Sequence, residues 1–176
     1  MTNLERLRRI RIVVLDVDGV LTDGSLVFSS EGELAKSFNV RDGLGIKLLQ
    51  AAGIEVAILT GRTSGIVSVR AAELGMNLVE QGRLRKLPTL RAMLARANLS
   101  PEECAYMGDD LPDLPCLREV GFAATPADGS AELEPWVHWR APHAGGRGAV
   151  RDLAETILQA KGLWEDLVRE RFLSQE

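Results

Sequence analysis

A pair of aspartates stands at the end of an apolar run in VVLDVDGVLTDG, residues 13–24. Asp16 and Asp18 are one residue apart, and two carboxylates held close together repel each other unless a positive charge offsets them. A hard cation such as Mg²⁺, which prefers oxygen ligands, would offset them. Asp-Gly is also a common turn sequence, so this motif alone is as compatible with a turn as with a metal site.

A second acidic cluster, GDDLPD at residues 108–113, contains Asp109, Asp110 and Asp113. It also follows a short apolar run, and acids in such a position often cap the next helix. The recurrence of acids after two separate apolar runs favours a shared cation site over two independent turns.

A hydroxyl and an amine complete the set of residues that could act on a phosphate. Thr60 lies in LTGR, where Gly61 leaves the backbone accessible to phosphoryl oxygens, and Lys86 supplies a compact positive charge after QGRLR. Each has a simpler interpretation, Thr60 as a helix cap and Lys86 as a solvated surface residue. Only a position beside the acids would give them a chemical role.

Buried strands and amphipathic helices alternate along the chain and would position these residues. Short apolar runs predict strands at 13–15, 54–62, 77–82 and 104–110, with further short strands possible at 120–125 and 136–140. Apolar residues at helical spacing predict helices at 42–53, 64–75, 86–99 and about 148–160, the second with Ser64 as its N-cap. This order predicts an α/β fold, a Rossmann-like three-layer sandwich with a mostly parallel sheet.

In parallel sheets of this kind, ligands bind beyond the carboxyl ends of the strands. Asp16, Thr60 and Asp109 each follow the apolar part of a predicted strand, so their side chains should converge on one edge of the sheet. We therefore expect a site for a phosphate and a cation there.

An insertion between the first predicted strand and the first predicted helix has a different pattern. The alternation around SSEGE predicts a β-hairpin within about 24–38, with its turn near Ser30 to Gly32. Its apolar side chains are Leu26, Val27, Phe28, Leu34 and Phe38. An isolated hairpin is marginal in water unless such a face is buried, so we expect the hairpins of several subunits to pack together. The alternative is a monomer whose hairpin folds back on its own sheet.

Length and composition indicate one domain, 1–176, without a large cap domain. The chain is 45% hydrophobic and 26% charged with a net charge of −4, which gives no basic field for nucleic acid. Its beginning fits neither a signal peptide nor a membrane span, so we expect no membrane partner and a cytoplasmic location. Cys104 and Cys116 lack metal-ligand spacing, and neither they nor His138 and His143 are assigned a role.

The ordered motifs DVDGVLTDG, LTGR, Lys86 and GDDLPD resemble those of the haloacid dehalogenase superfamily of phosphatases. Further stretches, FNVRDGLGIKLL, EVAILTGR, QGRLRKL, YMGDDLPD and AGGRGAVRD, are similar to its 3-deoxy-D-manno-octulosonate 8-phosphate phosphatase family, which lacks a cap domain. The similarity covers roughly Ile10 to Gly162, and the tail at about 163–176 carries no matching motif. Five motifs in one order make a chance match improbable.

The resemblance implies a mechanism and a ligand set. Asp16 would be the nucleophile that forms an aspartyl phosphate, and Asp18 the general acid that protonates the leaving alkoxide and then activates water. Mg²⁺ would be held by Asp16, the main-chain oxygen of Asp18, and Asp109. Thr60 and Lys86 would hold the phosphoryl oxygens, and Asp110 and Asp113 would orient the lysine and the waters on the metal.

The resemblance also implies a sugar phosphate substrate, used in lipopolysaccharide biosynthesis, and a homotetramer. Besides Asp18 and Lys86, the implied substrate contacts are Asn39, Val40, Arg41, Asp42, Gly43, Lys47, Arg62 and Arg70. Lys47 matches the family in charge only. Arginines suit a substrate with a carboxylate as well as a phosphate. The stretch PHAGGRGAV, 142–150, and the tail after it would serve as a mobile lid whose glycines permit bending.

Three alternatives remain open at this point. A receiver-like module also gathers acids, a threonine and a lysine around a phosphorylated aspartate, although Asp18 beside Asp16 favours turnover. A phosphatase of a related nonulosonate 9-phosphate would carry the same catalytic residues. A noncatalytic subunit that kept the fold is disfavoured because every catalytic position is present.

Overall fold

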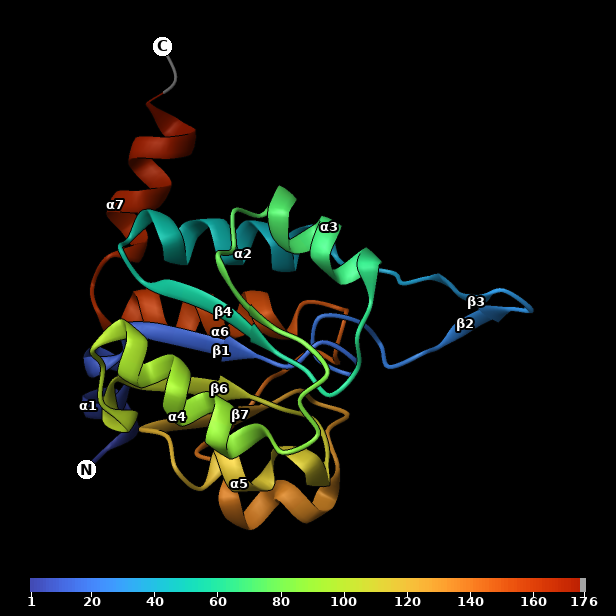
Figure 1. Ribbon diagram of the computed structural model, residues 1–176. Helices are drawn as coiled ribbons and strands as arrows, with labels where there is room; N and C mark the ends of the chain where they lie inside the picture. Colours follow the sequence, from blue (N-terminus) through green and yellow to red (C-terminus); the bar gives the residue numbers. More distant parts are fainter. Residues whose placement is uncertain (175–176) are drawn as a thin grey trace.

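Short, mostly apolar strands pair side by side to form the centre of the protein (Figure 1). The computed structural model describes residues 1–174. Its main sheet has six strands in the order β5-β4-β1-β6-β7-β8, and every pairing is parallel. The strands are β1 (Ile12–Leu15), β4 (Glu55–Leu59), β5 (Leu78–Glu80), β6 (Cys104–Met107), β7 (Phe122–Thr125) and β8 (Trp139–Arg140).

The strand order excludes one of the three alternatives. When the strands of this sheet are numbered along the chain, they lie in the order 3-2-1-4-5-6. This order reverses between β1 and β6. Receiver-like folds have the order 2-1-3-4-5, so the receiver alternative is wrong. Ligands of such sheets bind at the reversal, and Asp16 and Asp109 follow the two strands that flank it.

Helices cover both faces of the sheet, as the alternating pattern predicts. The face that carries Val13 and Leu15 packs against α1 (Asn3–Arg9), α2 (Val40–Ala51), α3 (Gly65–Glu73) and α6 (Ala149–Ala160). The face that carries Ile12 and Val14 packs against α4 (Lys86–Ala97) and α5 (Leu114–Leu117). The three-layer α/β sandwich is therefore confirmed. Within residues 1–174, no helix is both long and apolar enough to cross a membrane.

The expected elements are present with small shifts at their ends. The predicted strand at 136–140 is limited to β8, because residues Ala131–Trp136 form the 3₁₀ helix η3. Helix α1 was not predicted, although Thr2 and Glu5 form a capping box that the sequence already contained. Two further 3₁₀ helices are η1 (Pro101–Glu103) and η2 (Leu111–Asp113). The tail begins with α7 (Trp164–Val168) and a π-helical segment, η4 (Arg169–Leu173), while residues 175 and 176 lie outside the described part.

The predicted hairpin forms a separate antiparallel sheet that projects from the body (Figure 1). It consists of β2 (Val27–Ser29) and β3 (Gly32–Ala35), with Ser29 opposite Gly32 at the predicted turn. It does not fold back on the main sheet. Phe28 and Leu34 are 55% and 63% exposed. Phe38 is an exception to the expected apolar face, because it packs against the core beneath Arg70.

Candidate active site

Asp16 begins the site, because it directly follows the buried strand β1. Its backbone N–H donates to the carbonyl of Met107 at 3.1 Å, so the pairing of β1 with β6 extends to this residue. Its Oδ1 accepts the N–H of Val17 at 2.7 Å, so the backbone fixes one oxygen of the side chain and leaves Oδ2 for a side-chain partner.

Lys86, the first residue of α4, connects two carboxylates. Its Nζ donates to Asp16 Oδ2 at 2.6 Å and to Asp113 Oδ1 at 2.7 Å. The side chain is only 3% exposed, so the interpretation as a solvated surface lysine is wrong. Burial opposes the charged amine, but the carboxylates of Asp113 and Asp16 outweigh it and raise the pKa of Lys86. The amine therefore stays positively charged beside Asp16.

Asp113 organises the second acidic cluster. Its Oδ1 also accepts the hydroxyl of Tyr106 at 2.6 Å, and its Oδ2 accepts the backbone N–H of Asp109 at 3.1 Å. A Cβ on Gly108 would lie 2.3 Å from the Asp113 carboxyl carbon, so only glycine fits there. Sequence reasoning missed Tyr106. A tyrosine inside a buried strand needs a partner for its hydroxyl, and that need was the available signal.

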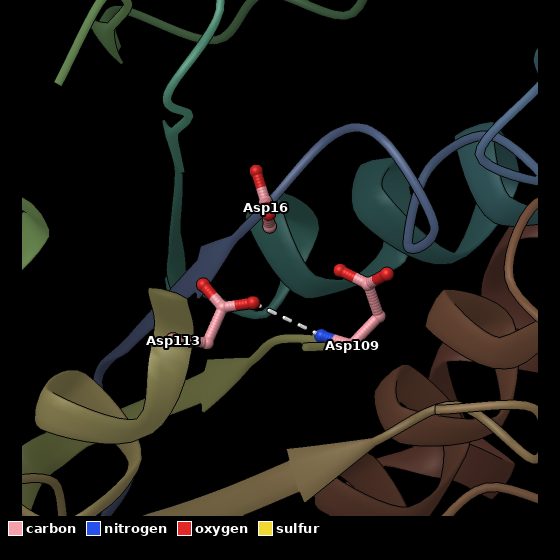
Figure 2. Close-up of side chains that lie close together, drawn as sticks. All are labelled: Asp16, Asp109 and Asp113. Carbon is pink, nitrogen blue, oxygen red and sulfur yellow. Dashed lines mark hydrogen bonds between the residues drawn. The ribbon is translucent and has the colours of Figure 1, made fainter. Parts of the chain in front are cut away.

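Asp16, Asp109 and Asp113 bring their carboxylates together from the ends of β1 and β6 and from η2 (Figure 2). One oxygen from each lies within 4.8 Å of the others. Burial, followed by the charges of Asp113 and Asp16, raises the pKa of Asp109 to about 7. Burial and the charge of Asp113 also raise the pKa of Asp16, although Lys86 acts in the opposite direction. Such crowding of hard oxygen donors fits a divalent cation.

The hydrogen bonds indicate which carboxylates of this cluster could bind a metal. Both oxygens of Asp113 already accept hydrogen bonds, from Lys86, Tyr106 and backbone N–H groups. Asp109 uses its backbone N–H in this arrangement and presents its carboxylate to the cluster (Figure 2). Asp16 and Asp109 are therefore the better side-chain candidates, and Asp113 holds Lys86 and the loop.

An open cleft of about 320 Å³ lies in front of these carboxylates. Its remaining lining residues are Asp18, Thr60, Gly61, Arg62, Leu84, Lys86, Asp110 and Pro112. Thr60 is buried, and its backbone N–H donates to Glu80 at 2.9 Å, which holds it at the end of β4. Asp110 accepts the N–H of Leu111 at 2.8 Å and begins η2. The structure thus brings all the predicted catalytic and metal-binding residues to one cleft.

Asp18 points toward the hairpin rather than into the carboxylate cluster. Its Oδ1 accepts a hydrogen bond from Lys36, which follows β3, and its Oδ2 lies 3.6 Å from Arg62 Nε. Lys36 is a further residue that sequence reasoning missed. Nothing in the alternating hairpin pattern distinguishes a buried lysine from an exposed one.

Of the expected substrate contacts, Asp18, Arg62 and Lys86 line this cleft, and the others lie outside it. Asn39, Asp42, Gly43 and Arg70 line a separate narrow hollow between α2 and α3, and Val40 and Arg41 are exposed on the first turn of α2. Asp42 is buried and accepts the N–H of Arg151 at 2.8 Å. Burial raises the pKa of Asp42, since the N–H groups around it only partly compensate.

Lys47 lies farthest from the cleft. Its Nζ donates to the carbonyl of Leu74 at 2.7 Å, and it lines a groove with Glu55 and Val56 at the beginning of β4. Helix α2 starts near the carboxyl ends of the strands, and seven residues along a helix span about 10 Å. The position of Lys47 on the far side follows from that distance.

The stretch 142–150 packs against the loop that follows Asp16 and does not line the cleft. A Cβ on Gly145 would lie 1.8 Å from the carbonyl oxygen of Gly19, and the N–H of Gly146 donates to Val20 at 2.9 Å. These glycines allow two backbones to pack closely, which supports the loop after Asp16 from beneath. The expectation that this segment and the tail form a mobile lid stays a prediction.

Comparisons with known proteins agree with this geometry. No family model matches the chain. It is 42% identical over 159 residues to 3-deoxy-D-manno-octulosonate 8-phosphate phosphatase KdsC of Escherichia coli K12, a match that covers 90% of this chain and 85% of that protein.

Two solved structures have the same fold over nearly their whole length. The phosphatase of this name from Moraxella catarrhalis, solved with magnesium, phosphate and KDO, is 38% identical with a TM-score of 0.92, covering 95% of this chain and 96% of that one. A probable YrbI family phosphatase from Pseudomonas syringae is 42% identical with a TM-score of 0.94, covering 98% of both chains.

Proposed function

Because the chain belongs to the 3-deoxy-D-manno-octulosonate 8-phosphate phosphatase family of the haloacid dehalogenase superfamily, we propose that it hydrolyses this sugar phosphate to the free sugar acid and phosphate. It is a phosphoric monoester hydrolase that uses Mg²⁺. The observation that carries the proposal is the buried Asp16–Lys86–Asp113 group beside Asp109 at the end of β1. The reaction fits a role in lipopolysaccharide biosynthesis, and we place it in the cytoplasm.

The residues of the cleft divide the reaction into two displacements. An oxygen of Asp16 attacks phosphorus, the bond from phosphorus to the sugar oxygen breaks, and Asp18 gives its proton to the departing alkoxide. Asp18 then takes a proton from water, whose oxygen attacks phosphorus and releases Asp16 and phosphate. Lys86 keeps a positive charge beside Asp16 throughout, and the hydroxyl of Thr60 donates to a phosphoryl oxygen.

Mg²⁺ would be held by the side chains of Asp16 and Asp109 and by the main-chain oxygen of Asp18. When bound, it neutralises part of the phosphoryl charge, so that an anionic nucleophile can approach. The crowded carboxylates and the raised pKa of Asp109, about 7, support this assignment, because a cation removes their mutual repulsion.

A panel of phosphate esters tests the proposed activity. We expect phosphate release from 3-deoxy-D-manno-octulosonate 8-phosphate in the presence of Mg²⁺, with loss of the activity in EDTA and recovery on addition of Mg²⁺. A related nonulosonate 9-phosphate is the competing substrate, and a higher kcat/KM for it would reassign the specificity. Asp18→Asn should bind substrate but turn over at least ~100-fold more slowly.

We further propose that the protein assembles as a homotetramer through its hairpins. The exposed apolar side chains of β2 and β3 support this, because such a face is marginal in water alone. The position of Asn39 and Arg70 outside their own cleft also supports it, since a neighbouring subunit could present them to another cleft. Light scattering at micromolar concentration should give a tetrameric mass, and Phe28→Asp should reduce it. A fully active monomer would contradict the proposal.

A further inference from the structure

We propose that Lys36, carried by the hairpin, is a positioning residue that holds the carboxylate of Asp18 in place for proton transfer. The inference rests on the proposed function, since it assigns Asp18 the proton that the leaving alkoxide receives. Its new content is that the hairpin is part of the catalytic machinery of its own chain, in addition to any role in assembly.

The contacts of Lys36 are those of a built ion-pair site. Its side chain is 1% exposed, although β3 as a whole lies at the protein surface. The amine donates to Asp18 Oδ1 and lies 3.0 Å from Glu33 Oε1. Burying an ammonium group is costly unless carboxylates compensate it, and here one carboxylate comes from the catalytic loop and the other from the hairpin.

This burial argues against two simpler roles for Lys36. A solvated surface lysine would not lie almost wholly buried between two carboxylates. A direct substrate contact would need the amine to face the cleft, but Lys36 is not among the residues that line it. What the amine touches is Asp18, so its effect on the reaction passes through that residue.

A second attachment joins the hairpin to the loop after β4. Glu33 Oε2 accepts the hydroxyl hydrogen of Ser64, and Ser64 is the N-cap of α3. Two residues before it, the guanidinium of Arg62 lies 5.6 Å from the centre of the Phe28 ring and 3.6 Å from Asp18. The hairpin therefore joins the loop that carries Asp18 to the loop that carries Thr60 and Arg62.

Proton transfer depends on placing the acid within hydrogen-bond reach of the leaving oxygen. Without Lys36, the Asp18 carboxylate would lose the partner of Oδ1 and could rotate away from that position. An alkoxide leaving group needs the proton, whereas p-nitrophenolate leaves without it. The loss of Lys36 should therefore slow the release of a sugar much more than the release of p-nitrophenolate.

The experiment compares Lys36→Met with the parent enzyme in single-turnover release of the leaving group. With Mg²⁺ present, we expect release from the sugar phosphate to slow by ~10–100-fold, the usual cost of losing a residue that orients a catalytic group. Release from p-nitrophenyl phosphate should change less than ~3-fold, because its leaving group needs no acid. Glu31→Gln, at the exposed hairpin turn, is the matched control and should behave as the parent on both substrates.

Equal slowing on both substrates, or no slowing on either, would overturn the inference while leaving the proposed function intact. A parent enzyme without Mg²⁺-dependent activity on either ester would instead reject the proposed function, and the inference with it. Should Lys36→Met fail to fold, Glu33→Gln provides the same comparison. It weakens the second partner of Lys36 and should slow sugar release selectively by ~3–10-fold. A nonselective effect of Glu33→Gln would count against the inference in the same way.

Discussion

Two buried lysines in this protein have similar surroundings but belong to different parts of the fold. Lys86 lies between Asp16 and Asp113, and Lys36 lies between Asp18 and Glu33. Lys86 is carried by a helix packed on the main sheet, and both of its partners belong to the same body. The hairpin projects from that body (Figure 1), and Lys36, which directly follows β3, reaches back to Asp18.

The difference separates the part of the site that the core fixes from the part that depends on the projecting hairpin. Tyr106, Gly108 and backbone N–H groups fix Asp113, so the surroundings of the proposed nucleophile are set by the core. The surroundings of the proposed acid are set by Lys36 and Glu33 of the hairpin segment and by Arg62 and Ser64 after β4. A small antiparallel pair with an exposed apolar face has little stability of its own. We therefore expect changes to the two lysines to have different consequences.

The largest effect should come from Asp16→Asn, which changes the proposed nucleophile in the part of the site that the core fixes. An amide is a poor nucleophile and a poor metal ligand, so kcat should fall by at least ~10⁴-fold. Asp23→Asn, which changes an exposed aspartate of the same loop, is the matched control and should keep its activity. Phosphate release from the sugar phosphate measures both variants. Activity of Asp16→Asn near that of the control would exclude Asp16 as the nucleophile.

The next largest effect is on the free energy of unfolding, which should differ between variants of the two lysines. Lys86→Met leaves Asp16 and Asp113 buried without their cation, which should cost ~3–5 kcal/mol. Lys36→Met should cost less than ~2 kcal/mol, because the hairpin can separate from the body without unfolding the sheet. Urea unfolding of the two variants, in EDTA at one pH, makes the comparison. Equal losses would show that the hairpin is as integral to the fold as α4.

Mg²⁺ and pH should then have coupled effects on stability. Asp109 has a pKa of about 7 in the folded chain, well above its ordinary value of 3.8. Between these two values the folded state holds a proton that the unfolded state has lost. The free energy of unfolding in EDTA should therefore fall as pH rises from about 4 to about 7, by up to ~1.4 kcal/mol per pH unit. The raised pKa of Asp16 acts in the same direction.

Because Mg²⁺ binds the ionised carboxylates, it should raise the melting temperature more at pH 8 than at pH 5. Asp109→Asn removes the titrating group and should flatten the dependence in EDTA. Thermal unfolding at several pH values, with EDTA or with excess Mg²⁺, tests both statements. An equal stabilisation by Mg²⁺ at pH 5 and pH 8 would contradict the assignment of Asp109 as a ligand.

The fold was largely predictable because its strands have strong local signals. Val13 to Leu15 form an unbroken apolar run that is fully buried, and Gly53 ends α2 in the left-handed conformation that favours glycine. The ends of β4 and β8 were less predictable, since β4 ends at Leu59 and Trp136 belongs to the 3₁₀ helix η3 instead of β8. Local pattern does not define those ends.

The site was predictable where its residues follow strands, and not where they meet across the fold. Asp16, Thr60 and Asp109 converge because parallel strands share one edge. Tyr106 and Lys36 act through partners that are distant in sequence, as in the contact from Lys36 to Asp18. The same limit explains Arg70, which is near Arg62 in sequence but faces the hollow under Phe38 instead of the cleft.

Replacing Arg62 or Arg70 should have a smaller effect, limited to substrate specificity. If they recognise the sugar carboxylate, Arg62→Ala and Arg70→Ala should each lower kcat/KM for 3-deoxy-D-manno-octulosonate 8-phosphate by ~10-fold or more, with less effect on a carboxylate-free sugar phosphate. Arg62 lines its own cleft, whereas Arg70 would act only on a neighbour's cleft. The Arg70→Ala effect should therefore disappear in dissociated Phe28→Asp protein. Equal losses on both substrates would remove these arginines from carboxylate recognition.

The smallest effect should come from Ser64→Ala, which cuts the second attachment of the hairpin. An N-cap serine replaced by alanine ordinarily costs about 1 kcal/mol, because its oxygen accepts an N–H at the start of the helix. The Ser64 side chain makes no such cap bond and donates to Glu33, where its hydroxyl is the main cause of the lowered pKa of that carboxyl. The variant should therefore leave the stability of α3 nearly unchanged.

Ser64→Ala should instead weaken the attachment of the hairpin, and this effect should reach Asp18 through Glu33 and Lys36. Because Lys36 keeps both carboxylates, we expect sugar release to slow by only ~2–5-fold, with p-nitrophenolate release unaffected. Ser68→Ala, one turn along the same helix, is the matched control and should change neither rate. Single-turnover rates and urea unfolding of both variants decide the matter. A loss of about 1 kcal/mol in Ser64→Ala without selective slowing would show that Ser64 serves the helix and that the hairpin reaches the acid through Lys36 alone.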